Sequence, residues 1–587
     1  MLVSGLVVAL LLWYLWPFVV QGDAFPLGPD GPVYLWWTRL AGVEGLSTVG
    51  SRPGVPALSL VLSGSLGLSV VQVTAALEVV LGAALGIASF AMVRRGGVAS
   101  AALAGLLAGT FGVHLAAGYL SNLAMAAAFV AATALLDGRT NRAAVIGGLV
   151  LAGSGLAHPQ FFLVAVVILG AAAVVAWRSD RGDALRIAGA AFGGGVVLGA
   201  GLLAVQVGPA PPDVDTSRDA FLRRAGLLSE LRSAYFDRFI HRWARYVQWL
   251  SVPLAIVGFR SPRGTAGRIL RSWFVVTVAG VALALVTGWL PADRFITFGF
   301  AIPMLAALGV VRVWRWLRRH AVIAVAIATA LVLAMLAGSW IAWDRQEPFI
   351  SERETLAVAR ANALVAELDQ NVPLAFVIDD GDPTMSFLAT RAGNVIRAGV
   401  AADRIRDVVV VVSRYEQANE ERRALERITA ADLAAAERLT DRVPTRIRLS
   451  PFDPSLEEQG SVEVEVGDDQ SAGMSAVETL ALEPLTPLGV TLASVAILIV
   501  LGVAGHGWAR IGIEDPVTAV AAAPGIGSAM LILAAVGLDA VGVAIGEAPG
   551  AIAALALGGA GGYLARFVLE RRARTRPAPQ VEEQPAE

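Results

Sequence analysis

Apolar runs alternate along the whole chain with short loops that carry arginine, proline or glycine. A helix of about 20 apolar residues crosses the hydrocarbon core of a bilayer, and most of these runs approach that length. We place about fourteen spans by this pattern, at residues 2–20, 70–93, 97–117, 119–136, 143–157, 159–177, 187–207, 246–259, 271–289, 294–312, 320–343, 485–506, 527–545 and 549–568. The pattern predicts an all-α polytopic membrane protein.

The arginine-rich loops alternate with loops that carry few basic residues. They are residues 94–95, 137–142, 177–186, 259–271 and 311–320, together with the tail after residue 568. Short loops rich in Lys and Arg stay on the cytoplasmic side, so both termini are expected inside. The first run lacks a basic leader, which favours a retained helix over a cleaved signal peptide. We expect a multi-pass protein of a bacterial plasma membrane.

Two long segments then fall on the outer side. Residues 210–245 predict an amphipathic surface helix, whose arginines either bind lipid phosphates or keep a linker helix soluble. Residues 344–484 predict a small inserted α/β domain, with helices at 351–368 and 417–440 and strands at 374–379 and 407–412. The predicted domains are therefore a transmembrane part (1–343, with an outer first loop at 21–56), the insertion, further spans (485–568) and a disordered cytoplasmic tail (569–587).

Composition narrows the function classes. The chain is 56% hydrophobic and 16% charged, and its mean hydropathy is +0.65, which excludes a large soluble core. The net charge of −2 argues against nucleic acid as a partner. Because the chain has no Cys, disulfides and thiolate chemistry are excluded. Phosphate-binding loops, zinc-protease motifs and serine nucleophile elbows do not occur in the sequence.

The first outer loop carries the most informative polar residues. Asp23 and Asp30 follow the first span, and Tyr34, Trp36 and Trp37 then lie in a predicted interfacial helix. Carboxylates held at a membrane surface are placed to act on a reactive group at that depth. The loop therefore suggests a lipid-linked substrate, with Asp30 as the first candidate for a catalytic acid and Asp23 as the second.

Further isolated polar residues fall on the same predicted face. They are Glu78 within a span, His114 and Tyr119, His158, and the adjacent Asp293 and Arg294. Ionisable groups in apolar spans are costly and usually face a cavity or a partner. We therefore expect Tyr34, Glu78, His114, His158 and Arg294 to bind substrate.

Each of these residues also has a purely structural explanation. Asp23 would cap a helix end, Asp30 would serve the turn Pro-Asp-Gly, and His158 would cap the span after it. Arg294 would anchor a span at the interface, and Glu78 would bond to the hydroxyl of a neighbouring helix. Both kinds of explanation remain open at this point.

Other acids are less informative. Asp379, Asp380 and Asp382 follow a predicted strand, where they would either hold a divalent cation or stand as ordinary loop residues. No cofactor follows from the sequence, and a divalent cation is the one candidate. Asp539 is remote from the other candidates in sequence, and we assign it no role.

The organisation of the first 345 or so residues resembles the GT-C superfamily of membrane glycosyltransferases. The resemblance rests on the acid and aromatic of the first loop (Asp30, Tyr34), two short helix-like pieces at residues 32–46 and 56–68, the pair His158-Pro159, and the Arg-bearing sequence 292–307. Two features depart from the usual pattern. Asp30 is followed by Gly31 rather than a second acid, and an insertion precedes three more spans.

The resemblance implies a polyprenyl-phosphate sugar donor, an outer-face glycan or lipid acceptor, and a role in the cell envelope. Asp30 would act as general base on the acceptor, and Arg294 or a histidine would neutralise the phosphate. Two other classes compete with this hypothesis. A transporter or flippase would use broken helices, such as one at Pro524-Gly525, and a non-catalytic membrane protein would present its soluble domain to a ligand.

Overall fold

The computed structural model describes residues 2–28, 31–49, 52–205, 248–287, 295, 297–346, 348, 374–379, 408–413, 448–449, 462–463 and 485–574. This part of the chain forms an all-α polytopic membrane protein with a few short strands in the insertion. The predicted surface helix at 210–245, the insertion's helices and residues 575–587 of the tail lie outside the described residues, whereas residues 569–574 belong to a helix. Asp30, Asp293 and Arg294 lie outside them as well.

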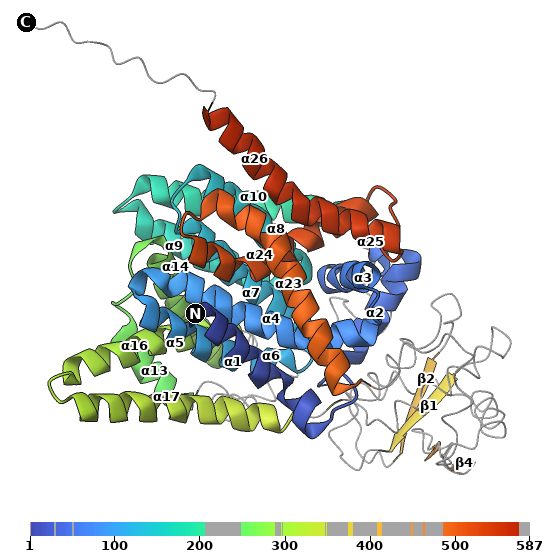
Figure 1. Ribbon diagram of the computed structural model, residues 1–587, viewed down its shortest axis with the longest axis horizontal. Helices are drawn as coiled ribbons and strands as arrows, with labels where there is room; N and C mark the ends of the chain where they lie inside the picture. The colour runs from blue at the N-terminus through green and yellow to red at the C-terminus, as the bar shows by residue number, and fades with distance from the viewer. Residues whose placement is uncertain are drawn as a thin grey trace, which may run out of the picture.

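The first part of the chain is a succession of helices joined by short turns (Figure 1). They are α1 (Leu2–Trp16), η1 (Pro17–Gln21), α2 (Gly31–Glu44), η2 (Leu46–Val49), α3 (Gly54–Leu66), α4 (Val70–Val93), η3 (Arg94–Gly96), α5 (Val98–Phe111), α6 (Val113–Ala116), α7 (Leu120–Leu136), α8 (Asn141–Ala157), α9 (Pro159–Trp177), α10 (Arg181–Ala204), α13 (Gln248–Gly258), α14 (Gly264–Thr287), α16 (Ala301–Leu317) and α17 (Ala321–Asp344). After the insertion come α23 (Pro487–Gly512), α24 (Pro516–Asp539), α25 (Ala548–Leu555), η7 (Ala556–Ala560) and α26 (Gly561–Arg574).

Every predicted span coincides with a described helix. Ten helical stretches are long and apolar enough to cross a membrane, and three further apolar helices (α3, α7 and α8) are shorter. Several bounds were wrong by six residues or more. Helix α14 begins at Gly264 rather than 271, α10 at Arg181 rather than 187, and α16 runs over Ala301–Leu317 rather than 294–312. Helix α23 ends at Gly512 rather than 506. In the first loop, α2 and α3 confirm the two helical pieces expected there.

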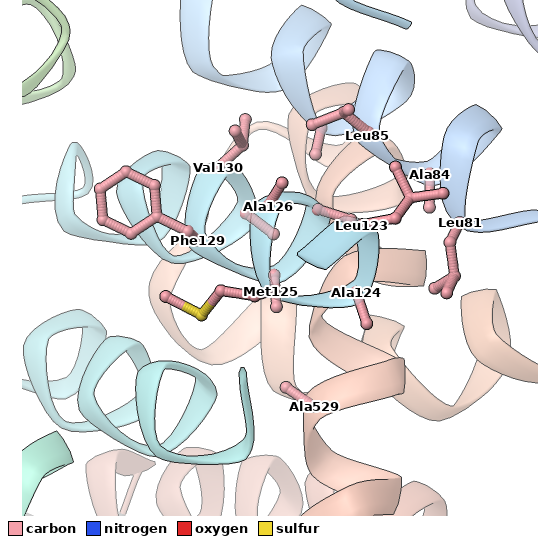
Figure 2. Close-up of a cluster of buried hydrophobic side chains, with 14 of the residues drawn as sticks. Leu81, Ala84, Leu85, Leu123, Ala124, Met125, Ala126, Phe129, Val130 and Ala529 are labelled. Atoms are coloured by element: carbon pink, nitrogen blue, oxygen red, sulfur yellow. The ribbon is translucent and has the colours of Figure 1, made fainter. Parts of the chain in front are cut away.

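Helix α4 forms the centre of the bundle. The most apolar part of α4, which is long enough to cross a membrane, is completely buried. Most of α17, in contrast, lies on the outside of the bundle. Leu81, Ala84 and Leu85 of α4 meet α7 in a tightly packed hydrophobic cluster (Figure 2). Alanine on the contacting faces allows the helices to approach closely, which matters in lipid because dispersion contacts then supply much of the packing energy.

Helix α24 corrects one sequence prediction. A span at 527–545 with a break at Pro524-Gly525 was expected, but the helix begins at Pro516 and continues through Pro524. Gly525 lies directly on α7, since an added Cβ would come within 2.7 Å of the Ala127 carbonyl oxygen. The glycine therefore serves close helix packing rather than a break.

The strands expected in the insertion are present. β1 (Leu374–Asp379) and β2 (Val408–Ser413) pair in parallel, with Leu374 opposite Val408. The prediction that these two segments are neighbours in one sheet is confirmed. β3 (Arg448–Leu449) and β4 (Val462–Glu463) form a second, antiparallel pair. Parallel strands must be joined by a crossover connection, which is usually a helix. The parallel pairing of β1 and β2 is therefore consistent with the α/β domain expected for the insertion.

The bundle has two chemically different ends. We call the end that carries residues 21–28, α2 and α3 the first-loop face. The opposite end, which carries the loops around Arg95, Asp137, Asp180 and Arg268, is the arginine face. Loops that the positive-inside rule assigns to one side meet one another at this second end.

Two buried carboxylates join the loops of the arginine face. Asp137 accepts hydrogen bonds from Arg95 and from the Ala266 N–H, and burial nevertheless raises the pKa of its carboxyl. Asp183 is fully buried, accepts a hydrogen bond from the Thr265 hydroxyl at 2.8 Å and pairs with Arg268. These contacts connect η3, α7, α10 and α14.

We expect Asp183→Asn to destabilise the protein by roughly 3 kcal/mol, because it leaves the largely buried Arg268 without its carboxylate. Reversible unfolding in mixed detergent micelles would measure the loss. Asp180→Asn is the matched control, since the side chain of Asp180 is 31% exposed, its ion pair with Arg139 is accessible to solvent and contributes little, and Asn caps a helix as well as Asp does. Equal losses in the two variants would contradict this account.

Candidate functional site

The first loop turns back into the bundle directly after the first span. Gly22 has φ +78°, and the Asp23 N–H bonds to the Pro17 carbonyl oxygen at 3.1 Å. This bond reverses the chain at the end of η1. The following residues, from Ala24 to Gly28, are buried rather than exposed on the surface.

Glu78 holds this loop in place from within α4. Both oxygens of its buried carboxylate accept the Leu27 N–H, at 3.1 and 3.2 Å. The structural alternative considered for Glu78 was a hydroxyl of a neighbouring helix, whereas the donor in the structure is the backbone of the first loop. Asp23 lies near enough for its charge to act on Glu78. Two acids predicted separately thus belong to one group.

Gly28 fixes the depth of the loop. Its φ is +71°, and an added Cβ would lie 2.4 Å from the Ala117 carbonyl oxygen. A side chain at this position would be both strained and in collision with the turn after α6. The loop is therefore seated against that turn two residues before Asp30.

The same loop anchors both stems of the insertion. Leu27 pairs with Pro348 in an isolated antiparallel bridge, and the Leu485 N–H bonds to the Ala24 carbonyl oxygen at 2.8 Å. Residues 348 and 485 are the described residues on either side of the insertion's first and last strands. The chain therefore leaves and re-enters the bundle beside Asp23 and Glu78.

The end of α17 reinforces this anchor. Gln21 donates to the Asp344 carbonyl oxygen at 2.7 Å, and the Trp16 indole N–H donates to the Asp344 carboxylate at 2.9 Å. Trp343, one residue earlier, donates to the Trp13 carbonyl oxygen at 2.9 Å. Helices α1 and α17 are thereby bonded together at the first-loop face.

Tyr34 lies on α2 with its ring buried. Its hydroxyl accepts the Ser121 N–H at 3.1 Å, and its ring packs edge-to-face on Trp37. The hydroxyl thus receives one of the amide hydrogens at the start of α7 that no helix carbonyl satisfies. Helix α2 is held against the bundle at this point.

His114 and His158 lie on either side of one buried segment, Thr297 to Phe300. The His114 ring nitrogens lie 2.5 Å from the Phe111 oxygen and 3.1 Å from the Thr297 oxygen. Carbonyl oxygens only accept hydrogen bonds, so a ring that made both bonds at once would carry two N–H groups. The segment begins three residues after Arg294.

His158 caps α9, as one of the two sequence interpretations proposed. Its Nδ1 accepts the Phe161 N–H at 3.3 Å. Phe161 stacks on Phe298, whose carbonyl oxygen accepts the Trp273 indole N–H at 2.7 Å. His114 therefore contacts the Arg-bearing segment directly, and His158 reaches it through Phe161.

The structure thus brings most of the predicted residues together in two adjacent groups. Asp23 and Glu78 form the first group, and His114 and His158 flank the second. Within the described residues, no three His, Asp or Glu side chains are grouped as ligands for a metal ion. The roles of these residues toward a substrate, and those of Asp30, Tyr34 and Arg294, stay predictions.

Sequence reasoning missed two acids of this face. Asp344 bonds to the first loop, and Asp539 accepts the Leu46 N–H at 3.2 Å beneath the α2–η2 turn. Asp539 lies at the end of α24, on the same predicted side as the first loop. Topology could have placed it there, but sequence distance suggested no connection.

Comparisons with known proteins include a distant structural match. No protein-family profile matches the chain, and no curated protein matches its sequence. A solved structure, the apo oligosaccharyltransferase of Archaeoglobus fulgidus, is similar with a TM-score of 0.43 and 12% identity. The match covers 69% of this chain and 64% of that one, so the chain spans less than two thirds of that protein's length.

We expect a disulfide to form readily between cysteines at positions 27 and 348. Paired residues of an antiparallel bridge have Cα atoms about 4.5–5.5 Å apart, which is within the range that disulfides span. Because the chain has no native Cys, Leu27→Cys with Pro348→Cys gives an unambiguous readout. Oxidation followed by labelling with a maleimide polymer under denaturing conditions would measure it.

The matched control combines Leu27→Cys with His320→Cys, at the opposite end of α17. That pair should remain fully labelled after oxidation. Full labelling of the 27–348 pair would show that the stem of the insertion is not anchored on the first loop.

Proposed function

We propose that this protein is a membrane glycosyltransferase. It moves a sugar from a polyprenyl-phosphate donor to a glycan or lipid acceptor at the outer face of a bacterial plasma membrane. The observation that carries the proposal is the seating of the first loop by Glu78 and Gly28. A loop held rigidly at the end of a helical bundle is a suitable support for a catalytic acid.

The proposed chemistry needs two charged groups. Asp30, or Asp23 as second choice, takes the proton of an acceptor hydroxyl while the hydroxyl oxygen attacks the anomeric carbon. The bond from that carbon to the phosphate oxygen breaks, and polyprenyl phosphate leaves. Arg294 neutralises the phosphate charge, which requires a cation more than a proton.

The attachment of the insertion is consistent with an acceptor bound beside the first loop. Its two stems bond to Ala24 and Leu27, next to the acids. An acceptor bound by the insertion would thus be held close to the first loop. The polyprenyl chain would lie in the bilayer beside the spans.

The transporter alternative receives less support from the described helices. Transporters of the inverted-repeat type bind substrate at unwound helices near the midplane. The break expected in α24 is replaced by a continuous helix. The buried acid Glu78 bonds to the first loop rather than facing the midplane.

We expect Asp30→Asn to slow glycosyl transfer about a hundredfold or more, the usual scale of general-base catalysis. Asn serves a turn as well as Asp, so a structural role alone would leave the rate unchanged. The measurement is transfer of radiolabelled sugar from a polyprenyl-phosphate pool by purified protein.

Arg294→Gln should weaken donor binding about tenfold, through the loss of a charged hydrogen bond.

The control is Asp180→Asn, an identical replacement on the arginine face. It should transfer at the wild-type rate. If Asp30→Asn and Asp23→Asn are both as fast as wild type, the first loop has no catalytic acid. Absence of transfer by wild type with every donor would shift support to the transporter.

A further inference from the structure

A cavity of about 390 Å³ opens at the first-loop face beside α2, and Asp539 is the acid among the described residues that line it. Gly42 of α2 and Gly45 directly after α2 line it, together with Ala204 and Val205 at the end of α10 and Asp539 at the end of α24. The volume is within the usual range for a small-molecule site. It belongs to none of the groups assigned above.

The walls of this cavity carry negative charge and, among the described residues, no positive charge. The carboxyl-terminal ends of α2, α10 and α24 all reach it, and Asp539 adds a carboxylate. The carboxyl-terminal end of a helix carries a partial negative charge of about half an elementary charge. At the end of α24 the carbonyl oxygens of Leu538 and Asp539 accept hydrogen bonds from the turn that follows, so Asp539 supplies the full negative charge. None of the described lining residues is basic.

The cavity is also preformed. Gly546 packs against α2 so closely that an added Cβ would lie 2.5 Å from the Gly42 carbonyl oxygen. One Asp539 oxygen is fixed by the Leu46 N–H, and the other faces Gly45. A rigid acceptor-lined cavity costs little ordering energy when a ligand binds.

We infer that this cavity binds a protonated primary amine. A carboxylate and three converging helix carboxyl ends favour a cation that donates several hydrogen bonds. The same walls repel phosphate, so the polyprenyl-phosphate group of the proposed reaction is not its occupant. The inference goes beyond the proposed function and does not depend on it.

The test uses purified protein in phosphatidylglycerol nanodiscs, which contain no amine. Saturation-transfer NMR compares ethanolamine with ethylene glycol, a neutral molecule of the same length, and with inorganic phosphate. Ethanolamine should bind, and the other two should bind at least about tenfold more weakly, since a hydrogen bond to a charged group exceeds a neutral one by that scale. Equal binding of ethanolamine and ethylene glycol overturns the proposal.

Asp539→Asn should weaken ethanolamine binding about tenfold or more while keeping an acceptor for the Leu46 N–H. Asp515→Asn is the matched control, because Asp515 caps the other end of the same helix and should bind ethanolamine like wild type. Unchanged binding by Asp539→Asn, or equal loss in both variants, overturns the proposal.

Ala540 provides a second test that removes no native contact of a side chain. It lies exposed beside Asp539 on the wall of the cavity. Ala540→Glu should strengthen ethanolamine binding and Ala540→Arg should weaken it, and both effects should shrink in high salt. The same affinity in both variants overturns the electrostatic account.

The amine could come from a lipid headgroup or from a soluble molecule such as an amino sugar. Replacing half of the nanodisc lipid by phosphatidylethanolamine should suppress ethanolamine binding if the headgroup enters the cavity. Competition by glucosamine alone identifies a soluble source. Either result supports an amine site, and competition by neither overturns it.

Discussion

The contact between the Glu78 carboxylate and the Leu27 N–H is the interaction on which the first-loop face depends. Within a bilayer, a buried carboxylate must find its hydrogen-bond donors in the protein. Glu78 finds one in a loop that would otherwise lie at the surface. The cost of burying one acid is thereby offset by a contact that draws the loop into the bundle. Gly28 then settles against Ala117.

The position of the loop determines how the insertion is attached. Because Ala24 and Leu27 are held in the bundle, their remaining backbone groups are available at fixed positions. The Leu485 N–H and Pro348 use them. A movement of either stem would therefore displace the backbone of the loop that bears Asp23. This coupling runs through backbone contacts, so it does not depend on the identity of most side chains in the loop.

The sequence predicted the helices well because hydrophobic length is the dominant signal in a membrane. It failed where local propensity suggested a break that packing overrides, as at Pro524 within α24. For the site, it identified Glu78 and Asp23 but could not join Glu78 to the first loop, because that contact is made to the backbone N–H of Leu27 rather than to a side chain. Asp539 was missed since nothing in the sequence relates it to Leu46.

Helix α2 separates two kinds of electrostatic environment on one face. Its 14 residues span about 21 Å, from the loop that precedes Gly31 to the cavity beside Gly45. Its amino-terminal end carries partial positive charge, which would favour the phosphate of the proposed donor, whereas its carboxyl-terminal end adds to the negative field of Asp539. An anionic donor and a cationic ligand would thus be sorted along one helix, each repelled from the other's position. The same polarity would keep the phosphate out of the amine cavity.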